Sequence, residues 1–565
     1  MESRSQPPYS RRVEIQNIYQ TYASGQPTLP ASSFLRFLQS DQLELSAELD
    51  TAIGLIDKYE IDEAVRESRG MTFEGFFRYM ESKDCSVFNQ AHTSVYQDMN
   101  QPLSSYFISS SHNTYLTGGQ LIGKSHLDAY YTALRKGCRC LEIDCWDGEN
   151  MEPVVFHGHT LTTKILFKDV ISTVEEHAFE VSPYPVILSL ENHCSKPQQE
   201  VMAEHLISIL GNKLLRCQIN ETPPGVLPSP NDLKYKILIK NKKLAPADEV
   251  RSRDEFDDEE DEEEEEEEED DEDDDEEEES QSRISWFWSP KKRSSKKKKK
   301  VVVAQSLSDL VIYTRSVKFV NFAHSESRQN FNENTSMAEM RARKLAKASG
   351  GNFVLHNQKF LSRIYPAGVR TTSSNYNPQE FWNVGSQLVA LNFQSFGKPM
   401  DLNDGRFLDN GGCGYVLKPA VLTCSEKGFN PHCRQRDVKP TQLLIKVISG
   451  SNLPIIRSSR VLDSFVRVEI HGIGSDYCQK STSTVKNNSL NPYWGTYMSF
   501  RLKIPELCLI RFNVRDQTGF FSSEFVGQYT LPFNCLKKGY RWVPLRSRDG
   551  YNLDPASLFV YITHS

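Results

Sequence analysis

The chain has 565 residues, of which 38% are hydrophobic and 10% aromatic, so it can build several packed domains. Its net charge of −9 arises in one segment, Asp254–Glu279, where every residue except Phe256 is acidic. Outside this segment and the basic cluster Lys291–Lys300, 58 basic residues face 50 acidic ones. This mild excess suits a phosphorylated ligand or an anionic membrane surface, and it argues against a dedicated nucleic-acid-binding domain.

Two further features argue against secretion and membrane insertion. The segment Met1–Pro8 has no apolar stretch typical of a signal peptide, and no run of about 18 apolar residues exists to span a bilayer. The 12 cysteines are scattered, and Cys138 and Cys140 lack the spacing of a zinc finger. We therefore expect reduced thiols and a cytoplasmic protein that associates peripherally with membranes, with a perinuclear or nuclear location as an open alternative.

The first part of the chain, from about residue 10 to about residue 90, has helical periodicity. Ile15 and Ile18 recur at helical spacing, as do Phe73 and Phe76, and two helix–loop–helix units fit this region. The first loop, Ala23–Phe34, holds no Asp or Glu. A calcium-binding EF-hand needs oxygen ligands at alternating positions and a carboxylate at the twelfth, so we expect these units to be structural.

From about residue 97 the pattern changes to short apolar runs that alternate with helical stretches such as Ser125–Lys136 and Gln198–Leu210. This alternation predicts β/α units around a parallel sheet. Two stretches with this pattern together have about the length of one (β/α)8 barrel. The strands expected in them are Tyr106–Ile108, Cys140–Cys145, Pro153–Phe156, Val186–Leu190, Lys236–Ile239, Leu310–Tyr313, Gln387–Asn392 and Tyr415–Lys418.

The charged segment separates the two stretches. Like charges at this density repel one another and stay solvated, so we expect a disordered linker. Acidic residues come first, then Trp286–Trp288, then Lys291–Lys300. Three interpretations stay open: a passive spacer, an acidic block that inhibits by repelling anionic membrane, or a basic cluster that tethers the protein to anionic lipid.

After about residue 440 the helical stretches end, and short alternating strands predict an all-β sandwich. The domains expected are therefore a helical region (1–95), two barrel halves (97–245 and 306–422) around the linker (246–305), and the sandwich (438–565). The strands expected in the sandwich are Leu443–Ile448, Ser464–Ile470, Tyr497–Leu502, Ile510–Val514 and Ser557–Thr563.

Polar residues follow the expected strands of the first barrel half. Strand alternation places Glu142 and Asp144 on one face. The remaining candidates at strand ends are His112, Asn113, His157, Glu191, Lys240 and Lys242. Because strand carboxyl ends meet at one mouth of such a barrel, we expect these side chains to converge there. Each residue alone has an ordinary structural explanation, but the whole set is hard to explain that way.

The chemistry of this set is that of a cation site beside acid–base groups. Oxygen ligands from Asn113, Glu142, Asp144 and Glu191 suit a hard cation, most naturally Ca²⁺. The two histidines suit proton transfer near neutral pH. The lysines suit phosphate groups.

Several motifs resemble the eukaryotic phosphoinositide-specific phospholipase C family. Ser111–Leu116, Cys138–Gly148 and Leu188–Cys194 are similar to its X region. Ser362–Gly368, Ser373–Tyr376 and Asn410–Tyr415 are similar to its Y region. The resemblance covers nearly the whole chain and implies EF-hand-like helices, a split TIM-like barrel and a C-terminal C2 domain.

The resemblance implies calcium-dependent hydrolysis of phosphatidylinositol 4,5-bisphosphate to inositol trisphosphate and diacylglycerol. Asn113, Glu142, Asp144 and Glu191 match the calcium ligands of the family. His112 matches the residue that stabilises the pentavalent transition state, and His157 the one that protonates the departing oxygen. Either Glu142 or Glu191 matches the general base.

The resemblance also implies substrate contacts and a physiological role. The residues that match phosphate-binding positions are Lys240, Lys242, Ser336 and Arg363, and Tyr365 matches the residue that packs on the inositol ring. Phe331–Asn334 and Gly527–Pro532 are most similar to the zeta type, with the delta type as the close alternative. A zeta-type protein would release calcium in the egg at fertilisation. We expect a monomer that binds this lipid and no nucleic acid; the rival hypothesis is an inactive phosphoinositide-binding scaffold.

The chain departs from the family pattern in three places. Its helical region looks shortened at the start relative to zeta-type proteins. In the apolar ridge around the barrel mouth, His159 and Arg343 replace apolar residues, so we expect membrane binding to depend more on charge. In the C2 domain Thr518 replaces a carboxylate near Asp463 and Asp516, which predicts a calcium-independent packing or lipid-binding module.

Overall fold

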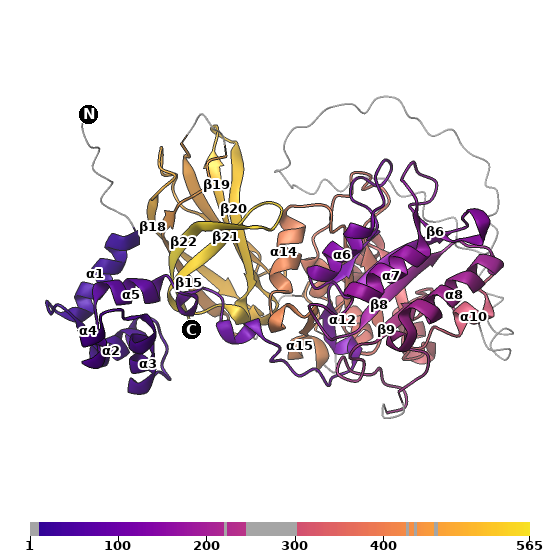
Figure 1. Cartoon of the computed structure of the whole chain (residues 1–565), viewed down its shortest axis with the longest axis horizontal. Coiled ribbons are helices and arrows are strands. Elements are labelled where there is room, and N and C mark those ends of the chain that lie inside the picture. The colour runs from indigo at the N-terminus through magenta and orange to yellow at the C-terminus, as the bar shows by residue number, and fades with distance from the viewer. Residues whose placement is uncertain are drawn as a thin grey trace.

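The computed structural model describes residues 11–219, 223–244, 302–424, 429–433, 435, 438–456 and 461–565. The helical region, the β-sandwich and the barrel lie side by side in that order along the long axis (Figure 1). The acidic segment and the basic cluster lie outside the described residues, so the three interpretations of the linker stay predictions. Among the described residues, none of the helices combines the length and the apolar character that a membrane span needs.

The helical region forms the two helix–loop–helix units expected from periodicity. Its helices are α1 (Arg11–Ala23), α2 (Ala31–Ser40), α3 (Leu49–Tyr59), α4 (Glu63–Glu67) and α5 (Phe73–Met80). The two loops pair through the short antiparallel strands β1 (Leu29–Pro30) and β2 (Gly70–Met71). The buried side chains of the helical region, many of them aromatic, form a cluster that extends onto Ile448 and Phe559 of the sandwich. Glu44 lies 2.9 Å from the buried Arg541 guanidinium, so this region docks on the sandwich through both apolar contacts and charge.

The two halves on either side of the charged segment form one (β/α)8 barrel. Within the described residues, eight parallel strands run around it. In spatial order they are β4 (Ser110–Ser111), β5 (Cys140–Trp146), β8 (Val186–Asn192), β9 (Ile237–Lys240), β10 (Arg315–Val317), β11 (Glu333–Ala338), β12 (Leu361–Tyr365) and β13 (Leu388–Leu391). A parallel bridge between Asn241 and Arg315 closes the ring across the two halves. The predicted split barrel is therefore confirmed.

Helices cover the outside of this sheet. They are α6 (Leu127–Arg135), α7 (Phe167–His177), α8 (Lys196–Leu210), α10 (Gln305–Ser308), α11 (Phe322–Arg328), α12 (Glu339–Lys359), α13 (Gln379–Trp382), α14 (Lys398–Arg406) and α15 (Ala420–Thr423). Leu141 and Ile143 of β5 pack outward against Val170 and Leu206 of these helices. Alternation along β5 then turns the intervening Glu142 to the opposite face, toward the barrel interior.

Two expected barrel strands lie outside the ring. Tyr106–Ile108 is strand β3, and it pairs antiparallel with β14 (Tyr415–Leu417) instead of entering the barrel. The chain turns at Ser109, and the short polar strand Ser110–Ser111 takes the barrel position before His112. An apolar run cannot distinguish a barrel strand from one that covers the barrel end, and for this reason the prediction was wrong here.

Two other strand predictions are corrected. The segment Pro153–Phe156 contains β6 (Val154–Val155), which pairs antiparallel with β5 and with β7 (Ile165–Leu166). A parallel connection needs about a dozen residues or more, and the chain between β5 and β6 is shorter than that. Leu310–Tyr313 forms no strand; this apolar run packs as a loop, with Leu310, Val311 and Tyr313 in the core.

The predicted all-β sandwich is confirmed at the carboxyl end. Its strands are β15 (Thr441–Ser451), β16 (Ser464–His471), β17 (Cys478–Ser481), β18 (Tyr493–Leu502), β19 (Leu509–Gln517), β20 (Ser523–Pro532), β21 (Gly539–Arg546) and β22 (Asn552–His564). All their pairings are antiparallel. The sandwich docks on the barrel through α14, where Arg511 lies 2.8 Å from Asp401, and both side chains are buried.

Candidate active site at the barrel mouth

Three carboxylates converge at the carboxyl ends of β5 and β8. Glu142 and Asp144 are two apart on β5, and the parallel register sets Asp144 beside Glu191. One oxygen from each of these side chains lies within 4.8 Å of the others. Glu142 and Asp144 are buried, whereas Glu191 is partly exposed and accepts a hydrogen bond from His193 Nε2 at 3.0 Å. The structure thus brings together Glu142 and Asp144, which alternation placed on one face, and Glu191, which was expected at the same mouth.

Asn113 joins this group from the end of β4. Its backbone has φ of 41°, a left-handed conformation that asparagine tolerates better than most residues. The Asn113 N–H donates to Glu142 Oε2 at 2.8 Å, and its amide nitrogen donates to Gln120 Oε1 at 2.7 Å. The amide oxygen is therefore the group that Asn113 can offer to a cation.

The carboxylates fit a hard divalent cation. Asp144 Oδ2 accepts the hydroxyl of Tyr115 at 2.6 Å, but Asp144 Oδ1 is buried without a hydrogen-bond partner among the described residues. Burial, reinforced by the charges of Glu191 and Glu142, raises the pKa of Asp144 well above its usual range. Three carboxylates and an amide oxygen form a donor set that calcium prefers. A divalent cation would offset the negative charge of these carboxylates.

Arg363 on β12 supplies a positive charge in the same place. Its Nη2 lies 2.8 Å from Glu142 Oε2, and both side chains are almost fully buried. Burial alone would lower the pKa of this guanidinium, but the charge of Glu142 outweighs it and raises the pKa. Arg363 Nε is buried without a hydrogen-bond partner among the described residues, so part of the guanidinium fork is uncommitted.

His112 is held in one orientation by a residue of the other barrel half. Its Nδ1 lies 2.9 Å from Asn392 Oδ1, which also accepts a hydrogen bond from Gln120. Nδ1 of His112 is therefore the donor, and Nε2 faces Glu142 Oε2 at 4.0 Å. Burial lowers the pKa of His112, with the nearby Arg363 charge acting in the same direction and Glu142 opposing it.

His157 reaches the mouth from the loop that follows β6. Its Nδ1 donates to the backbone carbonyl of Gln120 at 2.8 Å, which leaves Nε2 for proton exchange. The His157 N–H donates to Thr162 Oγ1 at 3.1 Å and fixes the loop from the other side. Both histidines thus have their Nδ1 atoms engaged and their Nε2 atoms available.

Gln120 connects the candidate residues, and sequence reasoning missed it. Its side chain bonds Asn113 and Asn392, its backbone carbonyl bonds His157, and Asn392 in turn holds His112. Gln120 Nε2 also donates to Ser373 Oγ at 2.9 Å, which joins the two barrel halves. A single glutamine in a glycine-containing loop has no motif that could have revealed this position.

Further candidate phosphate-binding residues lie on β9 and β11. Lys240 is buried, and its Nζ donates to Ser189 Oγ at 3.3 Å. Burial, with the charge of Arg363, lowers the pKa of Lys240 to about 8. Ser336 Oγ is buried without a hydrogen-bond partner among the described residues, and Lys242 is exposed. The Tyr365 ring lies parallel to that of His112, with 6.4 Å between the centroids.

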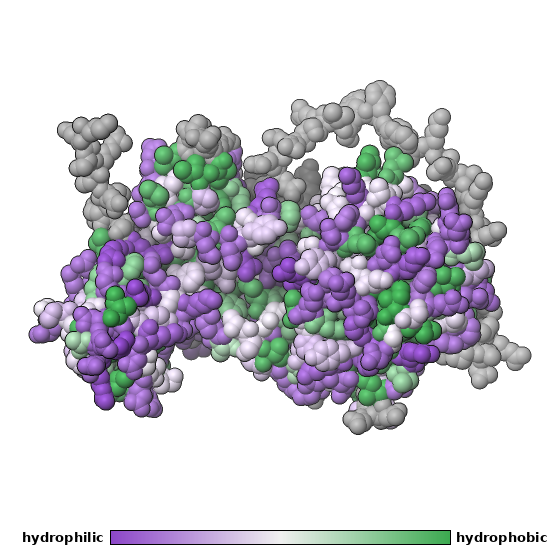
Figure 2. Space-filling model, viewed as in Figure 1, coloured by the Kyte–Doolittle hydropathy of each residue, from purple (hydrophilic) through white to green (hydrophobic). Residues whose placement is uncertain are grey.

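Exposed apolar side chains surround the mouth. They are Leu121, Ile122, Leu161 and Val369, each at least 51% exposed. Apolar atoms gather at the upper ends of both the barrel and the sandwich in Figure 2. Arg343, which was expected in this rim, has its charge paired, because its guanidinium lies 2.7 Å from Glu380 and 3.6 Å from Glu339. The helix that carries Arg343 turns it toward these carboxylates.

In the sandwich, the two expected aspartates bind backbone groups. Asp516 Oδ1 accepts the N–H of Asp463 at 2.7 Å, and Asp463 Oδ1 accepts the N–H of Asn487 at 2.9 Å. Thr518 Oγ1 lies 3.1 Å from Ser522 Oγ. The independence of this domain from calcium stays a prediction.

Family profiles match four parts of the chain. They are "Phosphoinositide-specific phospholipase C, efhand-like" over residues 9–90, "Phosphatidylinositol-specific phospholipase C, X domain" over 99–243, the Y domain of the same family over 307–421, and "C2 domain" over 441–545. Together they cover most of the chain.

Known proteins are similar over almost the whole length. The chain is 47% identical to 1-phosphatidylinositol 4,5-bisphosphate phosphodiesterase zeta-1 of Mus musculus, over 98% of this chain and 87% of that protein. It is 50% identical to the delta-4 enzyme of Homo sapiens, over 98% of this chain and 72% of that protein. The crystal structure of S. officinalis PLC21 aligns with a TM-score of 0.81 at 34% identity, over 98% of this chain and 68% of that one.

Proposed function

Because the chain belongs to the phosphoinositide-specific phospholipase C family and is a phosphatidylinositol 4,5-bisphosphate phosphodiesterase, we propose that the barrel mouth is its catalytic site. One observation carries this proposal: the carboxylates of Glu142, Asp144 and Glu191 converge beside His112 and the buried cations of Arg363 and Lys240. The expected products are inositol 1,4,5-trisphosphate and diacylglycerol.

The cation ligands and the base come from β4, β5 and β8. Asn113, Glu142, Asp144 and Glu191 would hold Ca²⁺, which supplies a positive charge that favours ionisation of the inositol 2-hydroxyl and offsets charge on the phosphate. Glu142 takes the proton of that hydroxyl. Its burial in the mouth and its position 4.0 Å from His112 support this choice over the more exposed Glu191, which is the alternative base.

The two histidines donate a hydrogen bond and a proton to oxygens of the reacting phosphate. The 2-hydroxyl oxygen bonds to phosphorus as the bond from phosphorus to the diacylglycerol oxygen breaks, giving a cyclic phosphodiester. His112, protonated at Nε2 as well as Nδ1, donates to a non-bridging oxygen as negative charge builds up there. His157 gives its Nε2 proton to the diacylglycerol oxygen. In the second step His157 takes a proton from the attacking water, the bond from phosphorus to the 2-oxygen breaks, and Glu142 returns its proton to that oxygen.

The remaining candidates bind the substrate away from the bond that breaks. Arg363, Lys240, Lys242 and Ser336 would bind the 4- and 5-phosphates, and Tyr365 would pack on the inositol ring. The uncommitted Arg363 Nε and Ser336 Oγ support this assignment, since both need a partner. Binding energy from these phosphates orients the reacting atoms, so losing one contact should lower kcat as well as affinity.

We propose that the apolar rim and the sandwich hold the mouth against an anionic membrane. Leu121, Ile122, Leu161 and Val369 can enter the acyl boundary, while the cations behind them attract lipid phosphates. Because the Arg343 charge is paired with two carboxylates, the apolar rim carries more of the contact than the sequence indicated. We expect a monomer at the membrane.

Hydrolysis of phosphatidylinositol 4,5-bisphosphate across a calcium titration tests this proposal. The account expects activity that is lost in chelator and restored by calcium alone. Activity that is independent of calcium would refute the proposed ligand set. Absence of hydrolysis with retained lipid binding would instead favour the inactive scaffold.

We further propose a zeta-like role in which the enzyme triggers calcium release in the egg. Identity of 47–48% to zeta-1 proteins of mouse and human supports it. The 50% identity to human delta-4 supports a second candidate, a general calcium-signalling enzyme. Injection of the encoding RNA into unfertilised eggs distinguishes the two. Repeated calcium transients at low expression support the zeta-like role, and their absence with full activity in vitro supports the second.

A further inference from the structure

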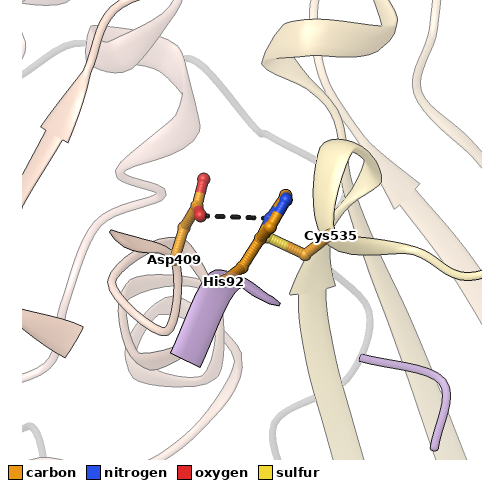
Figure 3. Close-up of side chains that lie close together, drawn as sticks. All are labelled: His92, Asp409 and Cys535. Carbon is orange, nitrogen blue, oxygen red and sulfur yellow. Dashed lines mark hydrogen bonds and ion pairs between the residues drawn. The ribbon is translucent and has the colours of Figure 1, made fainter. Parts of the chain in front are cut away.

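A second cluster of potential metal ligands lies far from the barrel mouth, where three parts of the chain meet. His92 belongs to the short 3-10 helix Gln90–Thr93 in the connector before the barrel. Asp409 precedes the turn Asn410–Gly412 of the barrel, and Cys535 ends the turn Phe533–Cys535 of the sandwich. The three side chains point toward one another from these separate segments (Figure 3).

The distances in this cluster match those around a tetrahedral ion. His92 Nδ1 lies 3.3 Å from Cys535 Sγ and 3.5 Å from an oxygen of Asp409. One donor atom from each residue lies within 4.8 Å of the other two. With bonds of about 2.0–2.3 Å to nitrogen, oxygen and sulfur, a tetrahedral Zn²⁺ separates its ligand atoms by about 3.3–3.6 Å. The distance from His92 Nδ1 to Cys535 Sγ falls within this range.

Neighbouring residues fix the orientation of the ligands. The Asp409 carboxylate accepts hydrogen bonds from the Tyr96 hydroxyl at 2.9 Å, from Gln97 Nε2 at 3.2 Å and from the Asn410 N–H at 2.7 Å. Tyr96 and Asn410 donate to Oδ1 and Gln97 donates to Oδ2, so one lone-pair position of the carboxylate, on Oδ2, is left for a cation. The His92 ring stacks on Tyr96, with 4.1 Å between the centroids. Such supporting contacts typically orient the ligands of protein metal sites.

Hydrogen bonds donated by backbone N–H groups hold the three segments in place independently of any ion. The Asn89 N–H donates to the Cys535 carbonyl at 2.8 Å, and the Tyr96 N–H donates to Asn410 Oδ1 at 3.0 Å. Asp409 and Cys535 are buried, while the His92 side chain is 14% exposed. The donors are therefore preorganised, which lowers the entropic cost of binding an ion.

We propose that His92, Asp409 and Cys535 form a binding site for a zinc-class divalent cation at the junction of the connector, the barrel and the sandwich. Imidazole, thiolate and carboxylate form a donor set that suits zinc, and a water molecule would complete four coordination. Binding releases the thiol proton of Cys535 to solvent, and the cation compensates the charge of the thiolate.

An open cleft lies next to the residues that surround this site. It has a volume of about 680 Å³, and Tyr96, Gln97 and Asn534 are among the residues that line it. The first two of these residues bind Asp409, and the third precedes Cys535. An ion in this place would link three segments that are far apart in sequence, so it should stabilise their docking.

Titration of the full chain with Co²⁺ and then Zn²⁺, in reducing buffer freed of metals, tests the site. A thiolate–cobalt charge-transfer band should appear at one equivalent and disappear when Zn²⁺ displaces the cobalt. Cys535→Ser should abolish the band, and His92→Gln should weaken zinc binding at least tenfold. Zinc should raise the thermal unfolding midpoint of the parent chain and leave that of Cys535→Ser unchanged.

Two control variants separate this site from other ligands. Cys424→Ser removes an exposed thiol, and Asp144→Asn alters the barrel mouth; both should keep the band. No band in the parent chain, or equal zinc affinity in the parent and His92→Gln, would overturn the proposal. If Cys535→Ser does not fold, the zinc affinity of His92→Gln decides the question, because His92 is partly exposed.

Discussion

The Arg363 guanidinium lies 2.8 Å from Glu142 Oε2, although the two residues belong to opposite halves of the barrel. Glu142 is also one of the carboxylates that would hold calcium. Calcium bound at this oxygen would compete with Arg363 for Glu142, and the displaced guanidinium would be available, together with its uncommitted Nε, for a substrate phosphate. Under the proposed function, such an exchange would couple cation binding to substrate binding.

Replacing Arg363 by methionine should change calcium binding and substrate binding in opposite directions. Without the guanidinium, Glu142 has no competing partner, so calcium affinity measured calorimetrically without lipid should rise severalfold. KM for the lipid should rise about tenfold because a phosphate contact is lost. Arg370→Met, which removes the charge beside Glu339 instead, should leave calcium affinity unchanged. A fall in calcium affinity in Arg363→Met would contradict the exchange.

Asp144→Asn should stabilise the calcium-free protein while it abolishes activity. Burial and the charges of Glu191 and Glu142 raise the pKa of Asp144, so its ionised form destabilises the fold above the pKa of the unfolded chain. The amide removes that cost, and the unfolding midpoint in chelator at neutral pH should rise by a few degrees. Hydrolysis should fall about 100-fold or more because a charged ligand is lost. Asp128→Asn, on an exposed side chain, is the control that should change neither quantity.

Headgroup binding should weaken as the pH rises above about 8. Burial and the Arg363 charge lower the pKa of Lys240 to about 8, so the free enzyme loses this positive charge in alkaline solution. A bound phosphate favours the charged form, so affinity for inositol 1,4,5-trisphosphate should fall through this range. Calorimetry at pH values on either side of 8 measures the effect. Lys240→Arg keeps its charge and should flatten the dependence; an equally steep fall in that variant would assign the effect to another group.

Asn392→Asp should extend activity to higher pH. The carboxylate would still accept the His112 Nδ1 proton and would raise the pKa of this histidine by about one unit. If His112 acts as an imidazolium, the alkaline limb of the kcat profile moves upward by a similar amount. Asn392→Leu, which removes the acceptor, should lower kcat without that extension. Identical alkaline limbs in Asn392→Asp and the parent would show that His112 does not act as a cation.

Gln120→Met should lower kcat about tenfold or more with little change in KM. Methionine keeps the size of the side chain but removes its bonds to Asn113 and Asn392, which orient a cation ligand and His112. The His157 contact uses the backbone and should remain. Gln394→Met is the matched control, since Gln394 bonds only the Gly118 carbonyl among the described residues. A change confined to KM would exclude the positioning role of Gln120.

Much of the fold could be predicted because local patterns determine it. On β5, a period of two separates the apolar residues Leu141 and Ile143 from Glu142 and Asp144. The opposite case is β11 (Glu333–Ala338), which escaped prediction because its sequence is largely polar although most of it is buried. Barrel interiors near a binding site hold polar groups, so apolar periodicity fails there.

The connections within the site could not be predicted, because they join residues far apart in the chain. His112 and Asn392 are 280 positions apart, and Gln120 and Ser373 are 253 apart. Motifs identify side chains with suitable chemistry, whereas hydrogen bonds between barrel halves depend on closure of the ring. The pairing of Arg343 with Glu380 was missed for the same reason.

The most direct test of the central claim is release of inositol phosphate from vesicles that contain phosphatidylinositol 4,5-bisphosphate, measured for the parent chain and for His112→Ala with calcium and with chelator. The account predicts release by the parent chain in calcium only, and almost none by His112→Ala, while both proteins bind the vesicles and unfold at similar temperatures. Comparable release by His112→Ala, or release by the parent chain in chelator, would contradict the proposed site.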